Sequence, residues 1–277
     1  MTYKPKEITE EVNISKIHPL TNLAQLLGTV VGVSLAIYIA LGLAVDAIVP
    51  RIPIETEKAI GDSSIASAYL LLGGTPIEND PRISYLQELL NSLQDPEDKI
   101  PLTLHFLKSP IVNAAAIPGG HVLVTTAFLD EVKSENELAF VLAHELGHLR
   151  NRDGLRGLGR GLVLNLGWSL VFGTSGGGDS SVVGTVINLS SLNYSRSQES
   201  AADLSGLNAV IRRYGHGGHS LDLFKRLQDE ETDLKVTEYF YSHPFSENRV
   251  KKLEKNADKN GWSMQGEKTA LPQVFSQ

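Results

Sequence analysis

The sequence predicts a mainly helical α+β fold with a small sheet, preceded by one N-terminal transmembrane helix. Residues 23–45 form a mostly apolar segment that no charged residue interrupts, residues 102–126 alternate in hydrophobicity as short strands do, and later segments repeat apolar residues at helical spacing. The expected organisation is a polar tail (1–22), a transmembrane anchor (23–49), a connector (50–82), a folded domain (83–260) and a C-terminal tail (261–277).

Composition limits what the folded domain can do. A chain of 277 residues can form one or two domains with a substantial core. Its 25 Lys and Arg against 32 Asp and Glu give a net charge of -7, and no long basic run offsets it, so we expect no nucleic-acid partner. The chain has no cysteine, which excludes disulfides, thiol nucleophiles and cysteine-ligated metal sites. Any metal must therefore be held by His, Asp or Glu.

The apolar segment at residues 23–45 is long enough to cross a bilayer, because about 20 helical residues span its hydrocarbon core. The alternatives are a buried helix of a soluble domain, which is usually shorter and carries a polar stripe, and a cleaved signal peptide. A long polar stretch containing Glu7, Glu10 and Glu11 precedes the segment, which argues against a signal peptide. We therefore expect an uncleaved single-pass anchor in contact with the lipid bilayer.

Charged residues beside the anchor weakly encode its orientation. Lys4, Lys6 and Lys16 precede the segment, and Arg51 and Lys58 follow it closely. Because positive charge favours the cytoplasmic side, we expect the N-terminus inside and the folded domain outside the cytoplasm, on the periplasmic side.

The first elements after the anchor are a connector, a helix and a small sheet. Pro50 and Pro53 predict an extended start to the connector, because a proline disfavours helical geometry in the residue before it. Apolar residues at helical spacing predict a helix at residues 84–94. Alternation predicts three strands, of which the last two are joined by a turn containing Gly119 and Gly120; the strands are expected at residues 102–107, 112–116 and 122–126.

The second half of the chain is predicted to be helical. Ser134 and Glu137 have the spacing of a capping box, and the apolar stripe after them continues to about Asp153. The apolar residues 161–173 are too few to span a bilayer, so we expect a packed or interfacial helix there. Further helices are predicted at residues 197–213 and 221–229, and the polar residues from Gly261 onward are expected to form a loosely held tail.

The helix predicted after Ser134 carries the motif His144-Glu145-Leu146-Gly147-His148. Residues four apart lie on one helical face, so both imidazoles can bind a single tetrahedral ion while Glu145 lies beside a water on that ion. The motif therefore predicts a metal site, and the ligand types favour zinc.

A catalytic zinc site normally has three protein ligands and a water, so a third ligand is needed. A third histidine six residues beyond His148 is excluded, because Gly154 occupies that position. The segment Glu199-Ser-Ala-Ala-Asp203 offers two carboxylates on one helical face, with small residues between them that allow close helix packing. Either acid could be the ligand, and the other would orient a histidine through its free ring N–H.

Four motifs together resemble one known family. They are His144 to His148, Glu199 to Asp203, the segment Asn113-Ala-Ala-Ala-Ile-Pro-Gly-Gly-His-Val-Leu-Val124 and the later Ser242-His243-Pro244. In this order they resemble the HtpX-like and CAAX-prenyl-protease-type membrane zinc metalloendopeptidases, over about residues 60–255. The resemblance implies a zincin-type metallopeptidase domain with one Zn²⁺ per chain.

The resemblance also implies roles for individual residues. It makes Glu199 the third zinc ligand beside His144 and His148, and Asp203 the partner that orients a ligand. It places His243 near the metal, to stabilise the oxyanion or transiently occupy the open coordination site, with Arg249 supporting that region. Taken without the resemblance, a histidine before a proline is an ordinary turn residue.

The segment at residues 113–116 has a second interpretation besides an ordinary core hairpin. An extended substrate can pair with an exposed sheet edge through main-chain hydrogen bonds, and the resemblance suggests that this edge is Asn113, Ala114, Ala115 and Ala116.

Two features depart from the family pattern. In the interval of about 50 residues between His148 and Glu199, a shorter segment replaces the second hydrophobic hairpin of multispanning relatives, which leaves the number of membrane contacts open. His216 and His219 have glycine neighbours that give no rigid scaffold, so we assign them to a loop.

The resulting hypothesis is a membrane-anchored zinc endopeptidase in which Glu145 takes the proton of a zinc-activated water and passes it to the leaving amine. Unfolded or membrane-associated polypeptides and a role in protein quality control fit a tethered protease. A protease for prenylated proteins would need a membrane chamber that a single span cannot form. The competing hypotheses are a metal-binding membrane adaptor or chaperone with little turnover, which has no need of Glu145, and a metal-storage or sensor module, which predicts several sites. The oligomeric state is not encoded in any of these patterns.

Overall fold

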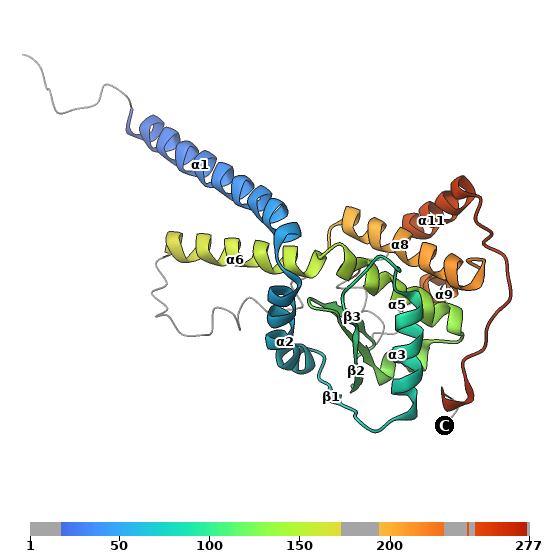
Figure 1. Cartoon of the computed structure of the whole chain (residues 1–277). Helices are drawn as coiled ribbons and strands as arrows, with labels where there is room; N and C mark the ends of the chain where they lie inside the picture. The colour runs from blue at the N-terminus through green and yellow to red at the C-terminus, as the bar shows by residue number, and fades with distance from the viewer. Residues whose placement is uncertain (1–17, 173–193, 230–242, 244–246, 276–277) are drawn as a thin grey trace, which may run out of the picture.

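The N-terminal helix extends away from the folded domain (Figure 1). The computed structural model describes residues 18–172, 194–229, 243 and 247–275. Helix α1 (Pro19–Ile48) begins at the capping residue His18 and continues into a 3-10 turn, η1 (Val49–Arg51). Within the described ranges this is the one helix long and apolar enough to cross a membrane, and none of its apolar window is buried.

A second helix, α2 (Ile54–Leu71), follows directly and lies where the sequence analysis predicted only a connector. Its buried positions are Glu57, Gly61, Ser64 and Ala68, spaced by three or four residues as in a helix. Because these residues are small or polar, they produce no apolar stripe and the helical pattern is hidden. Gly61 is required by packing, since a Cβ there would lie 1.9 Å from the Pro118 carbonyl oxygen.

The predicted sheet is present and gains a short edge strand. Its strands are β1 (Thr75–Pro76), β2 (Thr103–Lys108), β3 (Ala114–Ile117) and β4 (His121–Thr125), in the order β1-β2-β4-β3. Strand β4 pairs in parallel with β2 and antiparallel with β3. The β3–β4 turn uses Gly119 and Gly120 at φ values of 85° and 91°, which glycine adopts most readily. Helix α3 (Pro81–Leu93) packs beside β2.

Helix α5 (Glu135–Arg150) is the centre of the domain, and every residue of it up to Leu149 is buried. Short helix α4 (Thr126–Glu131) leads into it, and α5 packs between β3 and helix α8 (Arg196–Tyr214) (Figure 1). The predicted capping box is half formed: the Ser134 hydroxyl accepts from the Glu137 N–H at 3.3 Å, but the Glu137 carboxylate accepts from the Lys133 N–H instead.

The predicted helix break near Asp153 is present, but a new helix starts there. Arg152 has a φ of 54°, which ends α5, and α6 runs over Asp153–Phe172. The apolar residues 161–172 are therefore the second half of a 20-residue helix. Glycines at 154, 157, 159 and 161 weakened the helical signal of its first half, because glycine is a poor helix former.

The C-terminal part differs from the expected loose tail. After α9 (Asp222–Asp229) and α11 (Glu247–Asn260), residues 261–275 run back over the domain and end in a 3-10 turn, η3 (Gln273–Phe275). The Thr269 carbonyl oxygen accepts a hydrogen bond of 2.9 Å from the Glu135 N–H at the start of α5, and the centroids of the Phe275 and Tyr85 rings are 5.4 Å apart. The segment is thus packed against the domain. The mainly helical α+β fold itself is as predicted.

Candidate active site

The two motif histidines project from one face of α5, as their spacing predicts. The Nε2 atoms of His144 and His148 are 3.1 Å apart, and neither side chain is exposed. Each ring has a carboxylate at its other nitrogen: Asp203 Oδ1 lies 3.1 Å from His144 Nδ1, and Asp153 Oδ2 lies 2.9 Å from His148 Nδ1. Such partners keep the proton on Nδ1, so both Nε2 lone pairs are directed at the same point.

Helix α8 brings its carboxylates to α5 through small residues. A Cβ on Gly147 would lie 2.8 Å from Ala202 Cα, and one on Gly206 would lie 3.0 Å from the His144 backbone nitrogen. The two helices are therefore in backbone contact at the site. At this distance Glu199 reaches both histidines, with Oε1 3.5 Å from His148 Nε2 and Oε2 3.6 Å from His144 Nε2.

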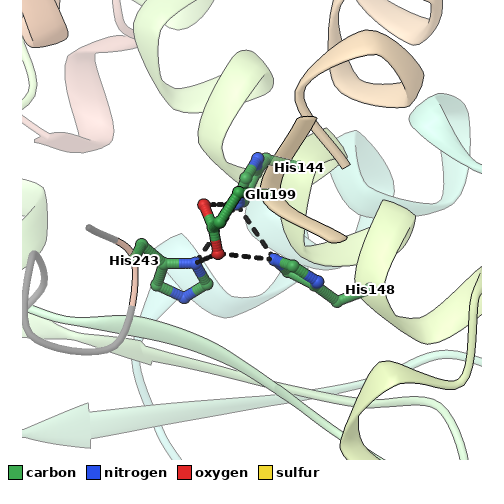
Figure 2. Close-up of side chains that lie close together, drawn as sticks. All are labelled: His144, His148, Glu199 and His243. Atoms are coloured by element: carbon green, nitrogen blue, oxygen red, sulfur yellow. Dashed lines mark hydrogen bonds and ion pairs between the residues drawn. The ribbon is translucent and has the colours of Figure 1, made fainter. Parts of the chain in front are cut away.

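His243 completes a cluster of four potential ligands (Figure 2). One ligand atom from each of His144, His148, Glu199 and His243 lies within 4.8 Å of the others, and all four side chains are buried. The His243 Nδ1 atom is 3.0 Å from Glu199 Oε1 and 3.2 Å from His144 Nε2. Three buried imidazoles and one buried carboxylate converging on one point are a donor set suited to a divalent transition metal such as zinc.

Asp203 and Arg249 lie behind this cluster. Arg249 donates two hydrogen bonds to Asp203, at 2.8 and 2.6 Å, and its Nη1 atom is 2.8 Å from Glu199 Oε2. Of the two acids that the spacing leaves open, Glu199 belongs to the four-residue cluster, and Asp203 contacts the Nδ1 atom of His144, on the far side of that ring. The Arg249 guanidinium connects the two carboxylates.

Glu145 lies beside the cluster rather than in it. Its Oε2 atom accepts a hydrogen bond of 2.9 Å from the Ala116 N–H of β3, and its Oε1 atom is 3.4 Å from His243 Nε2. Burial raises the pKa of Glu145 above its usual range, although the nearby histidines oppose the shift. A carboxyl group with a raised pKa can both accept and return a proton near neutral pH.

Burial and charge contacts compete at the other groups. Burial lowers the pKa values of His144 and His243, which favours their neutral, metal-binding form. At His148 burial is outweighed by the hydrogen bonds to Asp153 and Glu199, which raise the pKa to about 9. Burial is also outweighed at Glu199, whose contacts with His148 and His243 hold its pKa well below the usual range. Without metal, the raised pKa of His148 and the lowered pKa of Glu199 favour a protonated ring beside a carboxylate, and a bound cation would displace that proton.

Two residues of the site were not predicted from the sequence. Asp153 is the first residue of α6, and its carboxylate also accepts a hydrogen bond of 2.8 Å from the Gln198 amide. The sequence analysis predicts only the end of a helix at this position, five residues after His148. The Tyr194 ring stacks on the His148 ring, with centroids 3.9 Å apart and an angle of 13°. No local pattern marks Tyr194, because it precedes α8 and reaches His148 only through the fold.

The remaining predicted site residues lie on the edge strand and in a loop. Strand β3 is at the end of the sheet, begins one residue after Asn113, and directs the Ala116 N–H towards Glu145. His216 and His219 lie in the turn after α8, as expected, and neither belongs to the four-residue cluster.

Comparison with known proteins gives a family match and several relatives. Residues 76–257 match the family described as Peptidase family M48. The chain is 27% identical over 212 residues to a putative beta-barrel assembly-enhancing protease of Vibrio cholerae, which covers 71% of this chain and 43% of the relative. It is 25% identical over 212 residues to the beta-barrel assembly-enhancing protease of Escherichia coli K12, with the same coverage. It is 29% identical over 155 residues to the mitochondrial metalloendopeptidase OMA1 of Schizosaccharomyces pombe, covering 54% of this chain and 45% of the relative. The chain spans less than half the length of these relatives.

Proposed function

Since the chain belongs to peptidase family M48, we propose that it is a membrane-anchored zinc metalloendopeptidase that hydrolyses peptide bonds of polypeptide substrates. The observation that carries the proposal is the convergence of His144, His148 and Glu199 on one point with Glu145 beside it. The three converging residues are the proposed zinc ligands, and Glu145 is the proposed acid and base. A metal-binding adaptor would need the first three but not a buried carboxyl group beside them.

The chain's own groups divide the chemistry between them. Zinc, when bound, polarises the scissile carbonyl and lowers the pKa of a water. Glu145 accepts the proton of the attacking water at Oε1, since Oε2 is held by the Ala116 N–H, and then donates this proton to the leaving amine. Asp203 and Asp153 hold the two histidine rings in orientation.

His243 has two roles open to it in this scheme. Its ring is close enough to the four-residue cluster to act as a further ligand, and close enough to Glu145 to donate a hydrogen bond to the oxyanion that forms beside it. Arg249 restrains this region, because its Nη1 atom is 3.4 Å from the His243 carbonyl and its other nitrogens bind Asp203.

Strand β3 is the proposed substrate edge. Its antiparallel partner β4 occupies one side, and the Ala116 N–H points to the other side, where it meets Glu145. A substrate segment that pairs with Asn113, Ala114, Ala115 and Ala116 would therefore bring its own carbonyl groups next to the proposed base. Such pairing uses main-chain bonds and suits unfolded substrates of varied sequence.

The cellular role is proposed from the anchor and the relatives' names. Helix α1 would fix the domain at a bilayer surface, where unfolded or membrane-associated polypeptides are the accessible substrates. Quality control of such proteins is a role that suits a protease tethered there. We propose that the domain lies outside the cytoplasm. The absence of cysteine allows a direct test, because a single exposed Lys255→Cys would be labelled in intact cells by a membrane-impermeant maleimide only if the domain is outside.

The activity is tested by cleavage of an unfolded protein by the detergent-purified full chain. Wild type, Glu145→Gln and the control Glu254→Gln, whose carboxylate pairs with Lys225 on the surface, are compared with and without chelator and added zinc. We expect Glu145→Gln to bind zinc as wild type does and to lose nearly all turnover, while Glu254→Gln stays active. Zinc-loaded wild type that cuts no substrate, or a Glu145→Gln variant that cuts at the wild-type rate, overturns the proposal.

A further inference from the structure

A cavity of about 620 Å³ lies where the membrane helix meets the folded domain. The end of α1, the start of α6 and the start of α8 meet there (Figure 1). The described residues that line it include four arginines and two aspartates. None of the four cluster residues lines this cavity, because Asp153 and Gln198, which are bonded to each other, lie between the cavity and the cluster. The cavity is therefore a separate, positively lined space beside the anchor.

Two of the four arginines are neutralised from outside the cavity. The Nη1 atom of Arg150 lies 2.7 Å from Asp95. The Nε atom of Arg152 lies 3.0 Å from the buried Glu57, and its Nη1 atom donates to two carbonyls of the α1–α2 junction. These two side chains frame the cavity and contribute little free charge to it.

The other two arginines share one carboxylate. Asp46 lies 2.9 Å from Arg160 Nη2 and 3.4 Å from Arg156 Nε. Asp153 is 3.8 Å from Arg156, but its carboxylate is already bonded to His148 and to the Gln198 amide. The two guanidinium groups thus share Asp46 and have Asp153 only as a more distant second carboxylate, and they are partly exposed, at 24% for Arg156 and 40% for Arg160.

The opposite wall adds groups that favour an anion. Ser195 and Ser197 line the cavity at the N-terminus of the 19-residue helix α8, where the helix dipole is positive. Guanidinium forks and hydroxyl groups around a helix N-terminus are the donor set that binds phosphate oxygens. The Asp46 carboxylate already binds both guanidinium groups, so a phosphate would share them with it.

The position of the cavity beside the end of α1 indicates which kind of phosphate group is available to it. Asp46 is the first charged residue after the apolar segment, and the next, Arg51, ends the turn after α1. A bilayer spanned by α1 therefore has its headgroup layer at the level of the cavity. We propose that the cavity binds the phosphate of an anionic phospholipid headgroup, held by Arg156 and Arg160 with Ser195 and Ser197. This rests on α1 being the membrane anchor of the proposed function.

The test uses the full chain in nanodiscs of phosphatidylcholine alone or mixed with phosphatidylglycerol. Phosphatidylglycerol that stays bound after extraction into detergent is measured by native mass spectrometry, and Tm is measured in both lipids. We expect wild type to retain phosphatidylglycerol and gain Tm, and Arg156→Gln/Arg160→Gln to retain about tenfold less, as for the loss of charged hydrogen bonds. The control Arg51→Gln/Lys58→Gln removes the same charge from the same side of the membrane and should behave as wild type.

A second variant tests the sign of the effect. Asp46→Asn removes the carboxylate that competes for the two arginines, so retention of phosphatidylglycerol should rise. It also keeps the test valid if the double arginine variant does not fold. Equal retention by the arginine and control variants, or a fall in Asp46→Asn, overturns the proposal. Inorganic phosphate that raises Tm as much in phosphatidylcholine discs overturns the lipid assignment, and a chain that fails to insert contradicts the anchor itself.

Discussion

Replacing Gly147 by alanine should weaken zinc binding although the residue is not a ligand. Gly147 lies between the two motif histidines on α5, facing α8. The added Cβ would meet Ala202 Cα at 2.8 Å and the Ala202 carbonyl oxygen at 3.1 Å. Both atoms are backbone, so no side chain can turn away to make room. Helix α8 must move, and Glu199 moves with it.

The magnitude follows from two opposing effects. Ordinary contacts of a Cβ are 3.4–4 Å, so the helices must separate by several tenths of an ångström or more. Overpacking of this kind costs about 1–3 kcal/mol, whereas glycine to alanine in a helix gains about 1 kcal/mol. The net loss of up to about 2 kcal/mol lowers Tm by about 4–8 °C for a chain of this size. In addition, the affinity for zinc should fall by about tenfold to a hundredfold, because the movement of Glu199 disturbs the ligand geometry directly.

The assay compares Tm and zinc dissociation for wild type, Gly147→Ala and Gly167→Ala. Gly167 is also in a helix, and nothing lies within 4 Å of a Cβ placed there, so the control receives the helix-propensity gain without the clash. We expect Gly167→Ala to bind zinc as wild type does with an unchanged or higher Tm. If Gly147→Ala matches this control in both measurements, the close contact between α5 and α8 does not position Glu199.

Three further predictions concern His148 and its surroundings. In metal-free protein the raised pKa of His148 stabilises the fold fully at pH values below 6.5, the pKa of this histidine in the unfolded chain, and the stabilisation is lost as the pH rises through about 9. The Tm of chelator-treated protein should therefore fall between these two pH values. A Tm that does not change over this range would contradict the assignment. Asp153→Asn removes the charge at the Nδ1 side of the ring, so zinc affinity measured by competition with a chromogenic chelator should drop about 10- to 100-fold; an unchanged affinity would deny Asp153 a role. Arg152→Ala leaves Glu57 buried without its cation and should lower Tm by more than Arg150→Ala, whose partner Asp95 is nearer the surface; equal shifts would mean that the buried pair has no special importance.

Local sequence patterns predicted the parts of the site that depend on one element. His144 and His148 are four residues apart on a helix with a strong cap, and Glu199 and Asp203 repeat this spacing, so the geometry within each helix follows from its period. The choice of Glu199 over Asp203 at the centre was not contained in that spacing. It depends on how α8 crosses α5, which Gly147 and Ala202 determine by direct contact.

The residues that were missed act through tertiary structure or have weak local signals. Helix α2 buries Glu57, Ser64 and small residues, so its hydrophobic periodicity is nearly absent. Tyr194 reaches His148 from outside α8 by stacking, a contact with no periodicity at all. The C-terminal segment was expected to be loose because it is polar, yet it is bonded to the start of α5 through Thr269, and polar composition says nothing about main-chain pairing of this kind.

Two consecutive residues, Arg152 and Asp153, connect the segment after α1 with the four-residue cluster. Arg152 donates to the Val49 and Ile52 carbonyl oxygens, which lie between α1 and α2, and its Nε atom is 3.0 Å from Glu57 of α2. Asp153, the next residue, bonds His148. The backbone of Arg152 is in the left-handed region, which costs a residue with a side chain about 1 kcal/mol or more and persists only where contacts enforce it. Those contacts come from the residues that join α1 to α2 and from α2 itself. The junction between α1 and α2 therefore constrains the turn that supports His148, and a fragment that begins after η1 would lose the Val49 carbonyl that helps to hold this turn.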